Sequence, residues 1–64
     1  MSMYEHFKPY GFINESCIIG VTKSPRNNYY ILDESYNYLL CSESTFNELL
    51  DHGKPYIETK RKGV

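Results

Sequence analysis

Apolar and polar residues alternate along the middle of the chain, and this pattern predicts a small antiparallel sheet. β-branched residues in "GFINESCIIGVTK" favour a strand from about Ser16 to Lys23. One side of this run carries the apolar residues Ile13, Cys17, Ile19 and Val21, with Glu15 as the exception. The runs "YYILD" and "YLLCS" predict two more short strands, so we expect a three-stranded meander.

Two polar segments separate these predicted strands and are typical of turns. In "SPRNN", Pro25 presets φ, and Asn27 or Asn28 can take the left-handed conformation. The second segment, "ESYN", is also a turn sequence, although it contains no glycine. Short turns of this kind connect neighbouring antiparallel strands, which supports the meander.

A helical pattern replaces the alternation in "STFNELLDHG". Thr45 and Glu48 fit a capping box, in which each side chain caps the backbone amide of the other residue. Phe46, Leu49 and Leu50 have the i, i+3, i+4 spacing that places side chains on one helical face. A helix of about two turns is unstable alone in water, so we expect this face to pack against the sheet.

The helix should end at Gly53, which suits the left-handed residue beyond a helix, and Pro55 prevents its continuation. The following "PYIETK" can form a last strand. The predicted fold class is therefore α+β, mostly β: a small antiparallel sheet or partly closed barrel with one short helix before the last strand.

The pattern His-x-Lys-Pro-Tyr occurs twice, at residues 6–10 and 52–56. The second copy is a helix exit that leads into a strand, whereas the first precedes a strand and follows no helix signal. Proline is tolerated at the first position of an edge strand, which explains Lys-Pro-Tyr at both places. We interpret the repetition as coincidence rather than as an internal repeat or a pair of metal-ligand loops.

Length and charge limit the possible classes of protein. The 64 residues make one small domain, residues 1–59, followed by a basic and flexible tail, residues 60–64. The body carries eight acidic and four basic side chains, which argues against broad nucleic-acid binding. The N-terminus lacks the features of a signal peptide, and no apolar run approaches the length of a membrane span, so we expect a cytoplasmic protein without membrane contact.

Metal binding and catalysis find little support in the sequence. Four side chains could ligate zinc, and these are His6, Cys17, Cys41 and His52. They lack the close Cys-x-x-Cys spacing of zinc sites, so we favour buried core thiols over a disulfide or a metal site. Adjacent carboxylates such as Asp33 and Glu34 point apart in a strand-like geometry, and no phosphate loop or dinucleotide motif is present. We predict no enzyme activity, no metal and no cofactor.

Tyrosine is the most distinctive feature of the composition, with seven copies. Four of them flank the "DES" of the second turn, and the candidate binding residues are Tyr29, Tyr30, Tyr36, Tyr38, Asp33 and Glu34. Tyrosine supplies a broad contact area at low cost in conformational entropy, as in antibody binding surfaces. The alternative is that tyrosine is present because it favours strands. Consecutive strand residues point to opposite faces, so one of Tyr29 and Tyr30 should be exposed.

The segment "YYILDESYNYLLCSESTFNELLDHG" resembles the small SH3-like barrel proteins of phages of low-GC bacteria. Its order is a tyrosine-rich strand, an acidic turn, a strand and a helical entry containing phenylalanine. The resemblance implies an SH3-like, partly closed barrel and a non-catalytic module that binds a host protein or nucleic acid. The turn departs from the pattern, because such hairpins usually carry a glycine there.

From these features we expect a small binding protein that engages, and inhibits, a host protein through its acidic, tyrosine-rich surface. A host protein that itself binds nucleic acid would suit this surface, because it has a basic face. One alternative is direct nucleic-acid binding by the basic tail and the sheet aromatics. Another is a structural subunit of an assembly, and association with further copies of the chain stays open.

Overall fold

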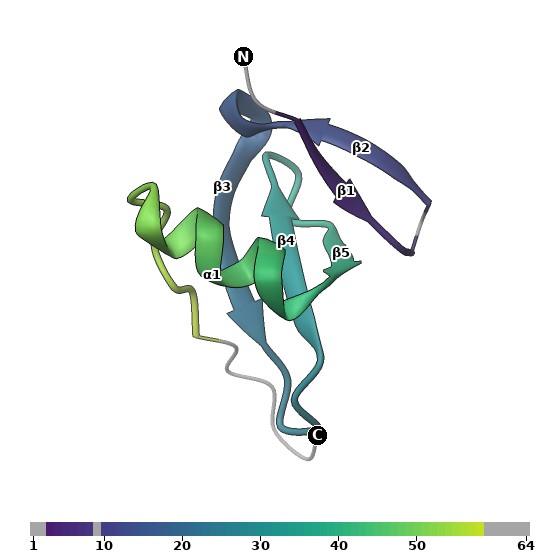
Figure 1. The fold of residues 1–64 in the computed structure, drawn as a ribbon, viewed down its shortest axis with the longest axis vertical. Helices are drawn as coiled ribbons and strands as arrows, with labels where there is room; N and C mark the ends of the chain where they lie inside the picture. The colour runs from purple at the N-terminus through teal and green to yellow at the C-terminus, as the bar shows by residue number, and fades with distance from the viewer. Residues whose placement is uncertain (1–2, 9, 59–64) are drawn as a thin grey trace.

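The computed structural model describes residues 3–8 and 10–58 of the chain. Its elements in chain order are β1 (Met3–His6), β2 (Gly11–Asn14), the 3-10 helix η1 (Glu15–Cys17), β3 (Ile18–Lys23), β4 (Tyr29–Asp33), β5 (Tyr38–Cys41) and α1 (Glu43–Asp51). The strands form two antiparallel sheets, β1–β2 and β3–β4–β5, and α1 lies across the larger sheet (Figure 1). This architecture is α+β and mostly β, as the sequence predicts.

The predicted meander is confirmed, because β3 pairs with β4 and β4 pairs with β5, both antiparallel. The first turn has the predicted chemistry. Asn27 takes the left-handed conformation with φ of 65°. The hydroxyl of Ser24 accepts hydrogen bonds from the backbone N–H groups of Arg26 and Asn28, each at 3.2 Å. Local hydrogen bonding therefore fixes this turn.

The predicted start and alternation of the first meander strand are wrong. The strand begins at Ile18, because the residues before it form the 3-10 helix η1. A β-bulge between Ile18 and Gly20 then shifts the register by one position. As a result Ile18 and Val21 enter the core, whereas Ile19 and Cys17 are only half-buried. A bulge places two residues opposite one, which interrupts a strict period of two.

The β1–β2 hairpin is an addition to the predicted fold. Tyr4 pairs with Ile13, and His6 pairs with Gly11. Beyond β1 the chain reaches the free edge of β5, where Phe7 N–H donates to Leu40 O at 2.6 Å and Leu40 N–H donates to Lys8 O at 3.0 Å. The hairpin thus lies beside the larger sheet (Figure 1), but the two sheets do not close into a barrel among the described residues.

The helix begins one turn earlier than predicted. Its N-cap is Ser42, whose hydroxyl accepts the Thr45 N–H at 3.1 Å, so the predicted capping box of Thr45 and Glu48 is wrong. Phe46 and Leu49 are buried against the sheet, as predicted. Leu50 is 37% exposed, so its prediction as a core residue is wrong. The helix contacts the sheet along a narrow stripe that does not extend to Leu50.

The predicted end of the helix is confirmed. Gly53 has φ of 92°, and the N–H groups of Gly53 and Lys54 donate to Leu50 O and Leu49 O, each at 3.0 Å. These two bonds form the pattern that closes a helix at a left-handed residue.

The segment after the helix runs parallel to β3. Val21 N–H donates to Pro55 O at 3.0 Å, and Ile57 N–H donates to Val21 O at 2.8 Å. Instead of the predicted last strand, the described part of "PYIETK" makes a single bridge, between Tyr56 and Val21. The remaining residues of that run, and the tail at 60–64, lie outside the described residues.

The core lies between the larger sheet, α1 and the hairpin. It consists of Tyr4, Ile18, Val21, Ile31, Leu39, Cys41, Phe46 and Leu49, with Ile13 and Tyr29 packed against it. No helix among residues 3–8 and 10–58 is both long and apolar enough to span a bilayer.

Candidate functional site

A groove of about 580 Å³ lies between the β1–β2 hairpin and the β4–β5 turn. Its lining comes from both sheets and consists of His6, Phe12, Ile13, Asp33, Asn37, Tyr38 and Leu39. Apolar and polar side chains contribute about equally to its walls, and concave sites that combine apolar contact area with a few fixed polar groups can hold a ligand. The groove is therefore a candidate binding site in the described part of the chain.

Asp33 organises the turn that forms one wall. Its Oδ1 accepts the backbone N–H groups of Ser35 and Asn37, each at 2.9 Å, and its Oδ2 accepts the Asn37 side-chain amide at 3.1 Å. These bonds, the backbone bond from Asn37 foremost, hold the pKa of the Asp33 carboxyl below its ordinary value. The wall consequently carries a fixed negative charge at neutral pH, which suits a cationic group better than acid–base catalysis.

The same turn presents Tyr36 to solvent. Tyr36 is 66% exposed and has φ of 62°, a left-handed conformation that is uncommon for residues other than glycine. Its N–H donates to Asp33 O at 2.9 Å, which closes the turn. The turn that was predicted from "ESYN" is thus confirmed, and the missing glycine is replaced by a tyrosine in the left-handed position.

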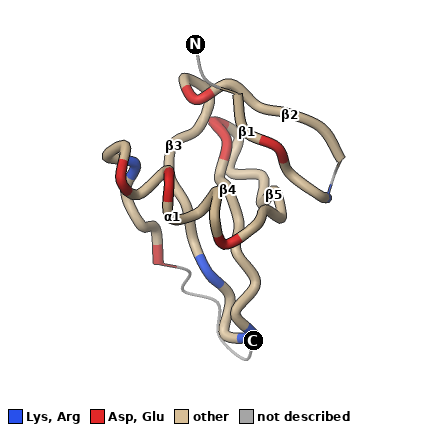
Figure 2. Tube along the Cα trace, in the orientation of Figure 1, with Lys and Arg blue, Asp and Glu red and all other residues tan. Residues whose placement is uncertain are grey.

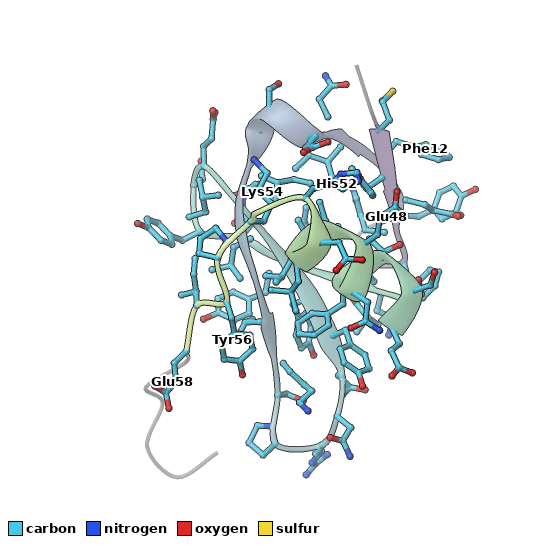
Figure 3. The ribbon with its side chains drawn as sticks, turned by 60° about the vertical axis from the view of Figure 1, so that its left-hand side comes forward. Phe12, Glu48, His52, Lys54, Tyr56 and Glu58 are labelled. Carbon is cyan, nitrogen blue, oxygen red and sulfur yellow. The ribbon has the colours of Figure 1, made fainter. Side chains whose placement is uncertain are left out.

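Aromatic side chains line both sides of the groove. Phe12, on β2, is 58% exposed, and Tyr38, on β5, is 40% exposed. The Tyr38 ring meets the Tyr30 ring edge-on, with centroids 5.8 Å apart, which holds Tyr38 in place. Figure 3 shows Phe12 at the outer side of the hairpin, away from the helix. Exposed aromatic rings that are held from behind are typical of protein-binding surfaces.

His6 contributes a buried polar group to the lining. It is only 6% exposed, and its Nδ1 is buried with no hydrogen-bond partner among the described residues. Gly11 lies across from it on β2, where an added Cβ would be 3.6 Å from the His6 ring. The glycine therefore leaves little free space on that side of the ring.

The six predicted binding residues do not form one surface. Tyr38 and Asp33 line the groove, and Tyr36 and the exposed Glu34 belong to the turn beside it. Tyr30 lies behind Tyr38, whereas Tyr29 packs against Phe46 of the helix, with ring centroids 4.8 Å apart. Both Tyr29 and Tyr30 are half-buried, so the prediction that one of the two is exposed is wrong. Contacts with Phe46 and Tyr38 cover their rings.

Three lining residues were missed by the sequence interpretation: His6, Phe12 and Ile13. All three belong to the β1–β2 hairpin, which was itself not predicted. A signal was present in "MYEH", where Met3 and Glu5 are exposed and Tyr4 and His6 are buried in strict alternation. Four residues are too few for that alternation to identify a strand alone.

Acidic side chains without a basic partner lie near the groove. Acidic positions lie around the hairpin and the β4–β5 turn and also along α1, whereas basic positions lie at the β3–β4 end, near the end of β1 and just beyond α1 (Figure 2). Glu5, the cross-strand neighbour of Phe12, and Glu34 are both exposed. Among the described residues, the ion pair found is between His52 and Glu15, so Glu5, Asp33 and Glu34 have no basic partner there. The groove end can therefore attract a cation from outside.

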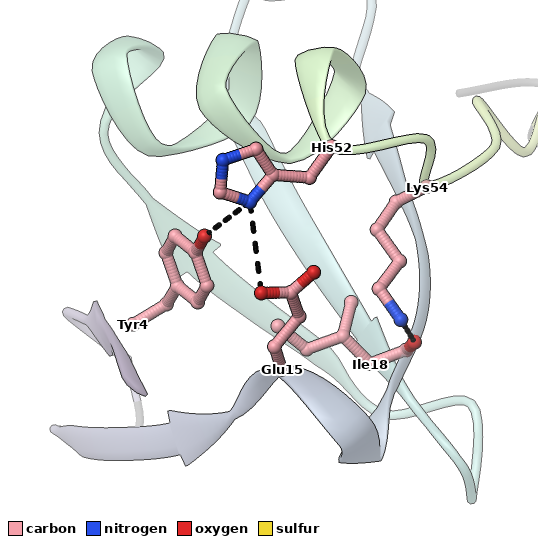
Figure 4. A network of polar contacts seen from close by, with 5 residues as sticks. All are labelled: Tyr4, Glu15, Ile18, His52 and Lys54. Carbon is pink, nitrogen blue, oxygen red and sulfur yellow. Dashed lines mark hydrogen bonds and ion pairs between the residues drawn. The ribbon is translucent and has the colours of Figure 1, made fainter. Parts of the chain in front are cut away.

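A separate polar network fastens the hairpin to the helix (Figure 4). His52 Nδ1 lies 3.0 Å from the Tyr4 hydroxyl and 3.6 Å from Glu15 Oε1. When His52 is neutral, its Nδ1 can accept a hydrogen bond from the Tyr4 hydroxyl. When His52 is protonated, its Nδ1–H can instead donate to the Glu15 carboxylate. Nearby, Lys54 Nζ donates to Ile18 O at 2.8 Å. This network joins elements that are distant in sequence, and its residues are not among those that line the groove described above.

The cysteines and histidines occupy four separate environments. Both thiols are free, and burial raises the pKa of the Cys41 thiol from 9.0 to about 11. A raised pKa leaves little thiolate at neutral pH, so Cys41 is a poor nucleophile and metal ligand. Across residues 3–8 and 10–58, no group of three or more histidine, cysteine, aspartate or glutamate side chains could hold a metal ion.

No protein-family model, curated protein or solved structure matches the chain.

Proposed function

We propose that the chain is a small, non-catalytic binding protein that holds a basic segment of a partner protein in the groove. The observation that carries this proposal is a groove with exposed aromatic rings, Phe12 and Tyr38, beside the charged carboxylate of Asp33. Aromatic rings supply contact area, and a carboxylate without a basic partner supplies selectivity for a cationic side chain.

The partner we propose is a host protein whose basic surface normally binds nucleic acid. Occupying that surface would inhibit the partner, in line with the resemblance to small SH3-like phage proteins. The acidic positions around the groove support this, because opposite charges accelerate encounter and exclude partners of like charge. The same charges disfavour direct nucleic-acid binding at the groove, because phosphates are anionic.

Titration with two defined peptides tests the proposal. One peptide alternates leucine with arginine, and its control has glutamate in place of arginine. In amide NMR spectra of the labelled protein, the basic peptide should shift the signals of Phe12, Asn37 and Tyr38. The shifts should weaken with added salt, because exposed charges are screened. The acidic peptide and a single-stranded oligonucleotide should leave these signals unchanged.

A pair of tyrosine substitutions localises the site. Tyr38→Ser should weaken binding of the basic peptide about tenfold, the size expected for losing a well-placed aromatic contact. Tyr10→Ser is the matched control, because Tyr10 is 79% exposed and lies outside the groove lining. Equal loss in both variants, or shifts confined to the β3–β4 end, would contradict the proposal.

A further inference from the structure

The two turns of the larger sheet share one backbone conformation. In each, a side-chain oxygen at the first position accepts N–H groups from residues two and four places later. The first positions are Ser24 and Asp33, and the fourth position has positive φ in both turns, 65° at Asn27 and 62° at Tyr36. The turns therefore form a natural comparison in which backbone geometry is constant and the left-handed residue differs.

Asparagine and tyrosine are unequal in this position. Asparagine visits the left-handed region readily, because its short polar side chain bonds locally. Tyrosine gains no such bond and crowds the following carbonyl group. Tyr36 also has no hydrogen bond from its hydroxyl and no ring contact with another aromatic residue in the described part of the chain, and it is 66% exposed. Packing within the described fold therefore does not explain why tyrosine stands here.

Strained residues that persist are concentrated at functional sites. Tyr36 follows Asp33 and Glu34 in the turn, and the next two residues, Asn37 and Tyr38, line the groove. Tyr36 is not itself in the groove lining, but it belongs to the turn that forms one wall, together with Glu34 and the lining residue Asp33. Arginine is the side chain that best suits an exposed aromatic ring in a turn that also carries two carboxylates, because its guanidinium stacks on aromatic rings and pairs with carboxylates.

The geometry points to Tyr36 as the anchor for an arginine side chain of the partner, held in a strained turn so that its ring faces outward. This inference rests on the proposed function and adds the identity of the recognised side chain. Lysine should be a weaker ligand than arginine, because its compact, strongly hydrated ammonium group does not stack. Citrulline, which is planar but neutral, should be weaker still.

Exchange of the two left-handed residues tests this. Tyr36→Asn should raise the melting temperature by about 4 °C or more, as expected when backbone strain is relieved in so small a domain. The same variant should bind the leucine–arginine peptide about tenfold more weakly than the unchanged protein. Asn27→Tyr is the mirror control: it should lower the melting temperature and leave peptide binding unchanged.

Three results would each mean something different. A protein that binds no basic peptide would contradict the proposed function and the anchor together. If Tyr36→Asn binds the basic peptide as tightly as the unchanged protein does, only the anchor is overturned. The same holds if arginine and citrulline peptides bind the unchanged protein equally tightly. A lower melting temperature of Tyr36→Asn would show that Tyr36 supports the fold, and the strain argument would then be wrong.

Discussion

Residues 6–10 and 52–56 share the pattern His-x-Lys-Pro-Tyr, yet their surroundings have little in common. The first copy ends β1, places His6 in the groove lining and leaves Tyr10 exposed. The second caps α1 with His52, which contacts Tyr4, and then runs beside β3. The same pattern thus gives a buried histidine whose Nδ1 has no partner among the described residues in one place, and a hydrogen-bonded, exposed histidine in the other.

One role is nevertheless common to both copies. β3 and β5 are the two edges of the larger sheet, and each copy supplies the backbone groups that pair with one edge. Phe7 and Lys8 pair with Leu40, and Pro55, together with Ile57 one residue beyond the second copy, pairs with Val21. Unpaired edges invite association with other chains, so covering them is useful. The comparison shows that this pattern is compatible with edge pairing but does not specify the rest of the structure.

The largest expected effect comes from a substitution at Gly20 of β3 that disturbs the pairing of Pro55 and Ile57 with this edge strand. An added Cβ would lie 2.5 Å from Ile57 Cδ1 and 2.8 Å from Pro55 O, so the segment must move. Gly20→Ala should destabilise the fold by about 1–3 kcal/mol, as overpacking does, in chemical denaturation. Hydrogen exchange should accelerate at Ile57 and stay unchanged at Phe7. Acceleration at both edges would show that the two copies are coupled.

The two histidines should respond oppositely to the same substitution. His52→Leu removes the bond with Tyr4 and should cost about 1 kcal/mol in thermal or chemical unfolding. His6→Leu removes a buried Nδ1 that lacks a partner, so stability should stay the same or rise by about 1 kcal/mol. If His6→Leu were the more destabilising variant, His6 would have a partner that the described residues do not show.

The two tyrosines provide a milder contrast. Tyr56 meets Phe46 edge-on, with ring centroids 6.2 Å apart, whereas Tyr10 is 79% exposed. Tyr56→Ser should lower the free energy of unfolding by about 0.5–1.5 kcal/mol, the value of an aromatic pair. Tyr10→Ser should change it by less than about 0.5 kcal/mol, as surface substitutions do. Equal effects would remove this distinction between the copies.

The smallest expected difference concerns the lysines. Lys54 Nζ donates to Ile18 O at 2.8 Å from a half-buried position, whereas Lys8 is exposed and has no side-chain hydrogen bond or ion pair among the described residues. Lys54→Met should cost about 0.5–1 kcal/mol, and Lys8→Met should be neutral, in matched urea titrations. A neutral Lys54→Met would show that solvent replaces this bond without loss.

Sequence patterns predicted the local features of the fold well. Asn27 in the left-handed position, the helix end at Gly53 and the burial of Phe46 and Leu49 all follow from rules that act within a few residues. The position of the helix N-cap was predicted wrongly, because a second hydroxyl residue nearby can also cap the helix. Ser42 rather than Thr45 caps the helix, and both are hydroxyl residues near its start.

The candidate site was only half accessible to prediction. Asp33, Tyr36 and Tyr38 come from one turn and its flanking strand, and their residue types indicated a binding surface. His6, Phe12 and Ile13, which line the groove together with Asp33 and Tyr38, come from a hairpin much earlier in the sequence. Their position depends on pairing of Phe7 and Lys8 with Leu40, which no local pattern reveals.

The sequence by itself determined the order of the three meander strands, the turn at Asn27 and the end of the helix at Gly53. Each depends on hydrogen bonds or steric limits between near neighbours, which residue types express directly. Tertiary structure alone decided the bulge after Ile18, the hairpin and the partners of the two edges. Those features depend on which distant segments can be buried together. Closing the loops between such segments costs conformational entropy, and burying their apolar surfaces stabilises the contact, so both depend on the whole chain.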